Sequence, residues 1–152
     1  MNPTNKQLAD RLEARIAMDI GGRVMPASGS RWGARRDIKS TKWLVEAKTT
    51  KQVYHRIISR DLEFLQKQAY GIGLTPAFVV EFQREGLVAL IPNDVMWGEG
   101  DVLVDRTDMG GWAFSYIEVE SIKIPLIVRF DLGCYAAIPY EQFLEIDRNF
   151  LP

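Results

Sequence analysis

Two acidic residues and a lysine in the first third of the chain have the types and spacing of a metal-dependent hydrolytic site. Glu46, Ala47 and Lys48 form an E-x-K triplet, and Asp37 precedes it in a D-x8-E-x-K pattern. Side chains alternate along a β-strand, so Glu46 and Lys48 would share one face, about 7 Å apart. If Asp37 ends the adjacent strand, its carboxylate meets Glu46 at that face.

Convergent carboxylates are unfavourable unless a cation joins them. Their hard oxygen atoms suit Mg²⁺ or Mn²⁺, with water and a substrate phosphate completing the coordination. Such an ion polarises a phosphate and activates water, and Lys48 would orient that water or neutralise charge on the phosphoryl oxygens. The pattern predicts phosphodiester hydrolysis, although an E-x-K triplet alone is most often a surface ion pair.

A third acid, Glu13, lies in a segment that predicts a helix over residues 4–20. Thr4 and Gln7 form a capping-box pattern, and Gly21-Gly22 is a C-terminal stop signal. Apolar residues repeat every four positions along one stripe of this helix: Leu8, Leu12, Ile16 and Ile20.

Glu13 borders that apolar stripe, which leaves two interpretations. It could join Asp37 and Glu46 at the metal site, or it could pair with Arg11 or Arg15 at the surface. Asp19 is the competing acid on the same helix.

The remaining segments position these residues within an α/β fold. Residues 26–36 are rich in Pro, Gly, Ser and Arg and predict a loop. Strands are expected over residues 23–25, 42–48, 76–82, 87–91, 114–120, 124–130 and 134–138, and helices over 59–71 and 140–146. Hairpins are expected for 76–82 with 87–91 and for 124–130 with 134–138, which resemble each other either by duplication or by chance. The order predicts one domain built as a sandwich around a mixed central sheet.

The charges are unevenly distributed, which favours a polyanionic partner. Residues 1–60 contain 13 Lys/Arg and 5 Asp/Glu, a balance of +8, whereas residues 61–152 have a balance of −9. Basic side chains supply most sequence-independent DNA affinity; a dipolar surface without a partner is the alternative. Trp32 would stack on an unpaired base or anchor its loop on the core. The candidate DNA-binding residues are Arg31, Trp32, Arg35, Arg36, Lys39, Lys42 and Lys51.

Several classes of site are disfavoured by composition. No apolar run approaches the ~20 residues that cross a bilayer, and the N-terminus is polar, so a cytoplasmic protein is expected. Cys134, the one cysteine, is expected in the core, and His55, the one histidine, at the surface. One Cys and one His cannot supply a zinc site, and no G-x4-G-K-[ST] loop for a nucleotide cofactor is present.

The run LEARIAMDIGGRVMPASGSRWGARRDIKSTKWLVEAKTT (residues 12–50) resembles the archaeal and phage-type Holliday junction resolvases, within the PD-(D/E)XK nucleases. That family has a Glu on its first helix, a Gly/Ser-rich loop, an Asp, and then E-x-K on a strand. TPAFVVEF (75–82) and AAIPYEQFLEI (136–146) match its following strand and its closing segment. Arg35-Arg36 stand where the superfamily label has proline. The resemblance leaves residues 93–123 as a probable insertion within a single nuclease domain spanning 1–152.

The resemblance implies a restriction-endonuclease-like core: a mixed central β-sheet flanked by helices, here with an extra C-terminal β-hairpin. It implies that Glu13, Asp37 and Glu46 are metal-site acids, joined by the Ala47 backbone carbonyl. It also implies that Lys48 is the catalytic lysine and that Ser30 belongs to a loop approaching the scissile phosphate.

The activity implied is that of a Mg²⁺-dependent homodimer, with Mn²⁺ as a substitute. Such a dimer resolves four-way DNA junctions, leaving 5′-phosphate and 3′-hydroxyl ends, in the host cytoplasm if the source is a phage. A restriction-like, nicking or repair nuclease on other DNA is one alternative. The other is a DNA-binding protein that keeps the nuclease fold without catalysis.

Overall fold

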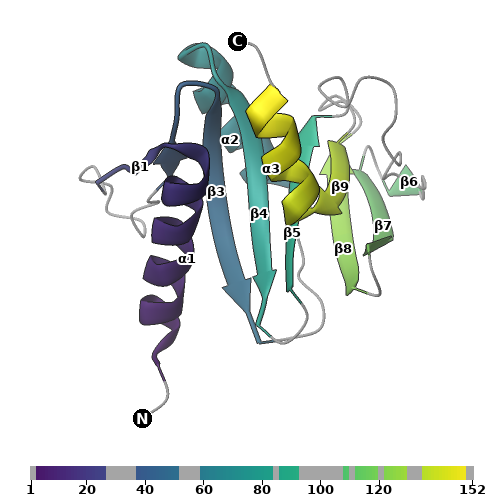
Figure 1. Cartoon of the computed structure of the whole chain (residues 1–152). Coiled ribbons are helices and arrows are strands. Elements are labelled where there is room, and N and C mark those ends of the chain that lie inside the picture. The colour runs from purple at the N-terminus through teal and green to yellow at the C-terminus, as the bar shows by residue number, and fades with distance from the viewer. Residues whose placement is uncertain are drawn as a thin grey trace.

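A computed structural model of the chain has a mixed six-stranded sheet, three helices and a separate three-stranded sheet (Figure 1). It describes residues 3–26, 37–51, 59–83, 86–92, 108–109, 112–119, 122–129 and 135–149. The helices are α1 (Asn5–Ile20), α2 (Ser59–Gly71) and α3 (Tyr140–Asn149). The larger sheet has the order β1 (Arg23–Val24), β2 (Ile38–Lys39), β3 (Trp43–Thr50), β4 (Thr75–Phe82), β5 (Gly86–Pro92) and β9 (Tyr135–Pro139). The predicted α/β class with a mixed central sheet is confirmed.

One parallel pair, β3 with β4, makes the sheet mixed, whereas the other neighbours are antiparallel. Parallel neighbours need a long crossover connection, and α2 lies in the connection between these two strands. The short strands β1 and β2 extend the sheet on the outer side of β3. The central pair is aligned along the whole length of β3, whereas the edge beside β3 is built from two-residue strands.

Alternating residues of the sheet form two apolar layers, one on each face. Trp43 and Val45 of β3 face α1 and α3, where they pack with Ile16, Ile38 and Phe143. Leu44 faces the other side, where α2 covers it. Figure 1 shows the same arrangement, with α1 and α3 in front of the sheet and α2 behind it. Both faces of β3 are thus buried, which explains its imperfect alternation of apolar residues.

Helix α1 begins and ends as the sequence predicts. The Thr4 hydroxyl accepts from the Gln7 N–H (3.1 Å), and the Gln7 side chain accepts from the Thr4 N–H (2.9 Å). Gly21 ends the helix in the left-handed conformation, with a φ of 66°. Gly22 then packs so closely on β2 that a Cβ there would lie 2.7 Å from the Lys39 carbonyl oxygen. The two glycines therefore set how the chain turns from α1 into β1.

Helix α3 is attached to the start of β3 by a buried polar contact. The Trp43 indole N–H donates to Asp147 Oδ1 (2.9 Å), and both residues are buried. The Lys42 ammonium donates to the Asp147 carbonyl and lies 3.9 Å from Asp147 Oδ1. The Phe143 ring meets Trp43 edge-on, with centroids 4.9 Å apart. The last helix thereby fixes the first residues of the strand that carries Glu46.

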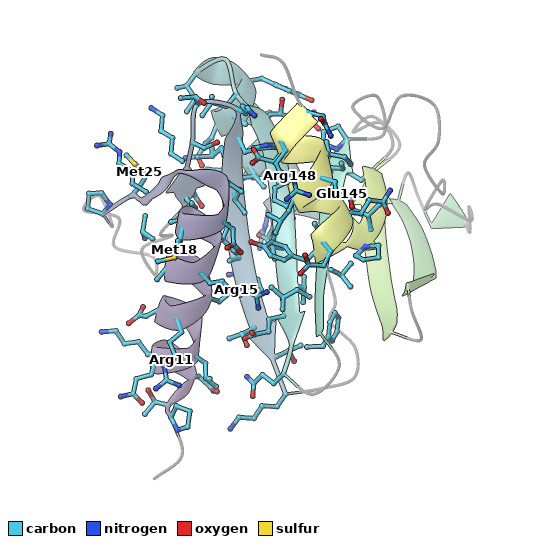
Figure 2. The ribbon with its side chains drawn as sticks, viewed as in Figure 1. Arg11, Arg15, Met18, Met25, Glu145 and Arg148 are labelled. Carbon is cyan, nitrogen blue, oxygen red and sulfur yellow. The ribbon has the colours of Figure 1, made fainter. Side chains whose placement is uncertain are left out.

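A second contact joins α3 to α1. The Tyr140 hydroxyl donates to Asp19 Oδ2 (2.7 Å), and the Arg15 guanidinium lies 5.3 Å from the Tyr140 ring centroid. Figure 2 shows Arg15 on α1, on the side that faces α3. Burial, reinforced by the hydrogen bond to Asp19, raises the pKa of Tyr140 well above its usual range. Its hydroxyl therefore stays a proton donor at physiological pH.

The expected C-terminal hairpin pairs differently from the prediction. Residues 122–129 form β8, which pairs with β7 (Trp112–Val119), and β6 (Asp108–Met109) completes that small sheet. Strand β9 instead pairs with β5 in the large sheet, where Tyr135 and Ile138 are buried in its two apolar layers. The prediction of a hairpin between 124–130 and 134–138 is wrong, because β9 gains burial in the core beside β5 that pairing with β8 would not give it. The expected similarity between that hairpin and the hairpin of β4 and β5 is therefore absent as well.

In the described part of the chain, none of the helices has the length and apolarity required to cross a bilayer.

Candidate active site

Strand β3 carries Glu46 and Lys48 on the face of the sheet that α2 covers. Leu44, on the same face, lies in the apolar layer beneath α2, and side chains two residues apart point the same way. Glu46 is only 4% exposed, whereas 44% of the Lys48 side chain is exposed. The face therefore changes along β3 from the apolar core, through a buried carboxylate, to an accessible ammonium group.

Strand pairing brings Asp37 opposite Glu46. Ile38 pairs with Val45 and Lys39 with Leu44, so the next pair along this antiparallel ladder is Asp37 with Glu46. Asp37 precedes β2 and does not end a strand as predicted, but its carbonyl still accepts from the Met25 N–H (2.8 Å). Directly opposite residues point to the same face, with Cβ atoms about 5 Å apart. Asp37 and Glu46 thus present their carboxylates side by side.

The carboxylate pair lies at the border between the core and the sheet edge. Inward from Glu46, the next residue across the sheet is Phe78 of β4, which is buried. Asp37 Oδ1 and Glu46 Oε1 are both buried atoms that accept no hydrogen bond among the described residues. Lys48 Nζ lies 3.5 Å from Glu46 Oε1 and supplies a positive charge there. A close pair of carboxylates is a common ligand set for a divalent cation.

Glu13 is buried, at 7% exposure, which excludes the interpretation as an exposed surface residue. Its helix, however, packs on the opposite face of the sheet from Glu46. From Glu46 toward the end of β3, the described part of the chain has no strand paired to the outer edge of β3. Helix α1, which carries Glu13, runs beside that edge (Figure 1). Asp19, the competing acid, accepts the Tyr140 hydroxyl and pairs with Arg15 at 3.7 Å, so its role is to join two helices.

The donor set fits one magnesium ion held partly by substrate. Among the described residues, no three Asp, Glu, His or Cys side chains converge as a metal-binding group. Mg²⁺ usually takes one or two carboxylates, keeps several waters and binds substrate phosphates. Asp37 and Glu46 could hold such an ion, with the Ala47 carbonyl beside them on β3. Glu13 does not complete a group with these two carboxylates, so its role as a direct ligand stays a prediction.

The predicted DNA-binding residues fall into different settings. Lys42 is engaged by Asp147 and stabilises the fold. Lys39 is half-buried at the sheet edge and Lys51 is exposed just after β3. Ser30, Arg31, Trp32, Arg35 and Arg36 lie outside the described residues, as do His55 and Cys134.

The register reveals two residues near the site that the sequence did not indicate. Met25 pairs across from Asp37, and Figure 2 shows it just beyond the end of β1. Arg23 pairs with Lys39. Both depend on β1 joining β2 across residues 27–36, and a two-residue strand leaves no periodic pattern that would announce this.

No protein-family model and no curated protein matches this sequence. The geometry of the strands therefore carries the functional argument.

Proposed function

We propose that this protein is a metal-dependent DNA endonuclease of the PD-(D/E)XK type, with a four-way junction as its substrate. One observation carries the proposal: the register of β2 on β3 sets Asp37 against Glu46, and Lys48 follows on the same face. The arrangement of an antiparallel edge, a parallel central pair and a helix between them supports a restriction-endonuclease-like core.

A divalent cation at this carboxylate pair would supply Lewis acidity toward the phosphate and toward an attacking water. Asp37 and Glu46 would hold and orient it, because the strand ladder fixes both backbones. The burial of Glu46 limits competition from bulk water and strengthens local electrostatic interactions.

Lys48 has the position required for a charge-stabilising residue. Its Nζ remains within 3.5 Å of Glu46 while the side chain is partly exposed, so it can reach both the acid and a phosphate arriving from solvent. An ammonium group there would donate to the attacking water or to a phosphoryl oxygen, where negative charge increases during the reaction. Glu13 would contribute through water from its buried position on α1.

Junction selectivity and a homodimer rest on the resemblance of residues 12–50 to the resolvases. A small chain without a separate base-reading module suits an enzyme that recognises DNA shape. Mg²⁺ is the expected cofactor, with Mn²⁺ as a substitute.

The test is a cleavage assay on a labelled four-way junction and a matched linear duplex, with Mg²⁺ or with EDTA. Asp37→Asn and Lys48→Ala should each lower the cleavage rate by a factor of 100 or more, on the order expected for an essential electrostatic group. Glu145→Gln and Lys67→Ala, on exposed positions of α3 and α2, are the matched controls and should cleave normally.

The outcomes distinguish a junction resolvase, a nuclease without junction selectivity and a non-catalytic DNA-binding protein. Paired symmetric cuts in the junction alone would support the resolvase. Equal cutting of the duplex would keep the nuclease and remove junction selectivity. Tight junction binding without cleavage in Mg²⁺ would replace the proposal with a non-catalytic DNA-binding protein.

A further inference from the structure

Two basic residues face each other at the outer edge of the large sheet. Arg23 of β1 pairs directly with Lys39 of β2. Their neighbours Val24 and Ile38 pack into the apolar layer under α1, so Arg23 and Lys39 point to the opposite face. That is the face on which Asp37 and Glu46 lie.

Like charges directly opposite each other destabilise a strand pair. In the described segments, neither Arg23 nor Lys39 makes an ion pair or a side-chain hydrogen bond that would offset this repulsion. Arg23 is exposed and Lys39 is half-buried, so an incoming anion can reach both. The pair has the chemistry of an anion site whose ligand comes from outside the protein.

The position of the Arg23–Lys39 pair relative to the two carboxylates indicates which anion would fit. Along β2, Lys39 lies two residues from Asp37, and Leu44 lies two residues from Glu46 on β3. Two residues of strand span about 7 Å, which is on the order of the spacing between successive phosphates of one DNA strand. Lys48 lies the same number of residues from Glu46 in the opposite direction, so basic groups flank the acids on both sides.

We infer that Arg23 and Lys39 bind the DNA phosphate adjacent to the one held at Asp37 and Glu46. The inference rests on the proposed nuclease function for the identity of its ligand. Arg23 would hold the DNA strand in register with the carboxylates, and Lys39 would bind the same phosphate.

Gly22 keeps the two cations together. A Cβ at this position would lie 2.7 Å from the Lys39 carbonyl oxygen and 3.1 Å from its carbonyl carbon. Any larger residue would push β1 away from β2 and separate Arg23 from Lys39. The close approach is therefore part of the anion site as well as of the fold.

The test measures binding of a fluorescent four-way DNA junction in EDTA over a range of salt concentrations, so that cleavage plays no part. Each phosphate contact contributes about 0.9 to the slope of log K against log salt. The double variant Arg23→Gln/Lys39→Gln should lower that slope by about 1–2 relative to the wild type. The control, Arg11→Gln/Arg148→Gln, removes the same charge from α1 and α3 on the opposite face (Figure 2) and should keep the wild-type slope.

A thermal melt without DNA separates binding from folding. Because the pair repels itself, the double variant should melt no lower than the wild type, which a structural role would not produce. If the double variant is unstable, the single variants Arg23→Gln and Lys39→Gln should each lower the slope, by less than one full phosphate contact because the other cation remains.

The inference would be overturned by a wild-type slope in the double variant, by an equal loss in the control, or by no junction binding in the wild type. A protein that cleaves DNA with an unchanged slope in the double variant would keep the nuclease and lose this site. Binding that depends on the pair, without any cleavage, would keep the site and remove the nuclease.

Discussion

Replacing Asp147 with alanine should destabilise the protein by removing a buried hydrogen-bond acceptor from α3. The carboxylate accepts from the Trp43 indole at 2.9 Å and lies 3.9 Å from the Lys42 ammonium group. Trp43 is fully buried, at 0% exposure, so its indole N–H depends on this acceptor. The substitution would leave the indole N–H buried without an acceptor side chain from Asp147.

The magnitude follows from that buried donor. An orphaned buried hydrogen-bonding group costs about 1–3 kcal/mol. The Lys42 ion pair adds little, because a partly exposed pair contributes about 0–1 kcal/mol. A total loss of about 1–4 kcal/mol should lower the melting temperature by roughly 2–16 °C for a chain of this length.

The assay is chemical denaturation followed by tryptophan fluorescence, with the melting temperature as a second measure. Asp147→Asn is the matched control, because its side-chain oxygen still accepts from Trp43 while the charge next to Lys42 is lost. It should cost under about 1 kcal/mol, as should Lys42→Ala. A loss below about 0.5 kcal/mol for Asp147→Ala, or equal losses for the alanine and asparagine variants, would refute the reasoning.

Three further predictions test the site and the contacts around it. Glu46→Gln should abolish the rise in melting temperature that Mg²⁺ produces in the wild type; an unchanged Mg²⁺ response would contradict the metal site. Tyr140→Phe should lower the free energy of unfolding by about 1 kcal/mol below pH 10; because the folded-state pKa of Tyr140 is raised, this advantage of the wild type should shrink as pH rises above 10, and a constant difference would contradict the assignment. Gly22→Ala should lower the free energy of unfolding by about 1–3 kcal/mol, because its Cβ would clash with the Lys39 carbonyl, and it should weaken DNA binding. Gly21→Ala has open space around its Cβ but a φ of 66°, so it should lower the free energy of unfolding by about 1–2 kcal/mol. It should leave the salt dependence of DNA binding unchanged.

Local signals were sufficient for the elements that carry the site. The capping box of Thr4 and Gln7 and the glycine stop at Gly21 are written in neighbouring residues, and both are present in the structure. The strand around Glu46 and the hairpin of β4 with β5 were likewise predictable, because alternation and turn composition depend on the chain nearby. The shared face of Glu46 and Lys48 followed from strand geometry alone.

Contacts between distant segments were not predictable in this way. Lys42 looked like one more basic residue beside the site, but Asp147, on the last helix, engages it. Strand β9 resembled the partner of β8, and only the apolar layers around β5 decide that it joins the large sheet. Asp19 and Glu13 are both acids of α1, and the Tyr140 hydroxyl bonds to Asp19.

The sequence by itself determined the helices, the central strands and the presence of Asp37, Glu46 and Lys48 in an order typical of metal-dependent nucleases. Tertiary structure alone decided that Asp37 stands directly across from Glu46 and that Arg23 stands across from Lys39. The pairing of Arg23 with Lys39 joins two two-residue strands separated by a long connection, and the pairing of Asp37 with Glu46 needs the two-residue β2 to turn back onto β3 through residues 40–42. Such strands contain too few residues to encode their partners, so the packing of Val24 and Ile38 under α1 sets their register.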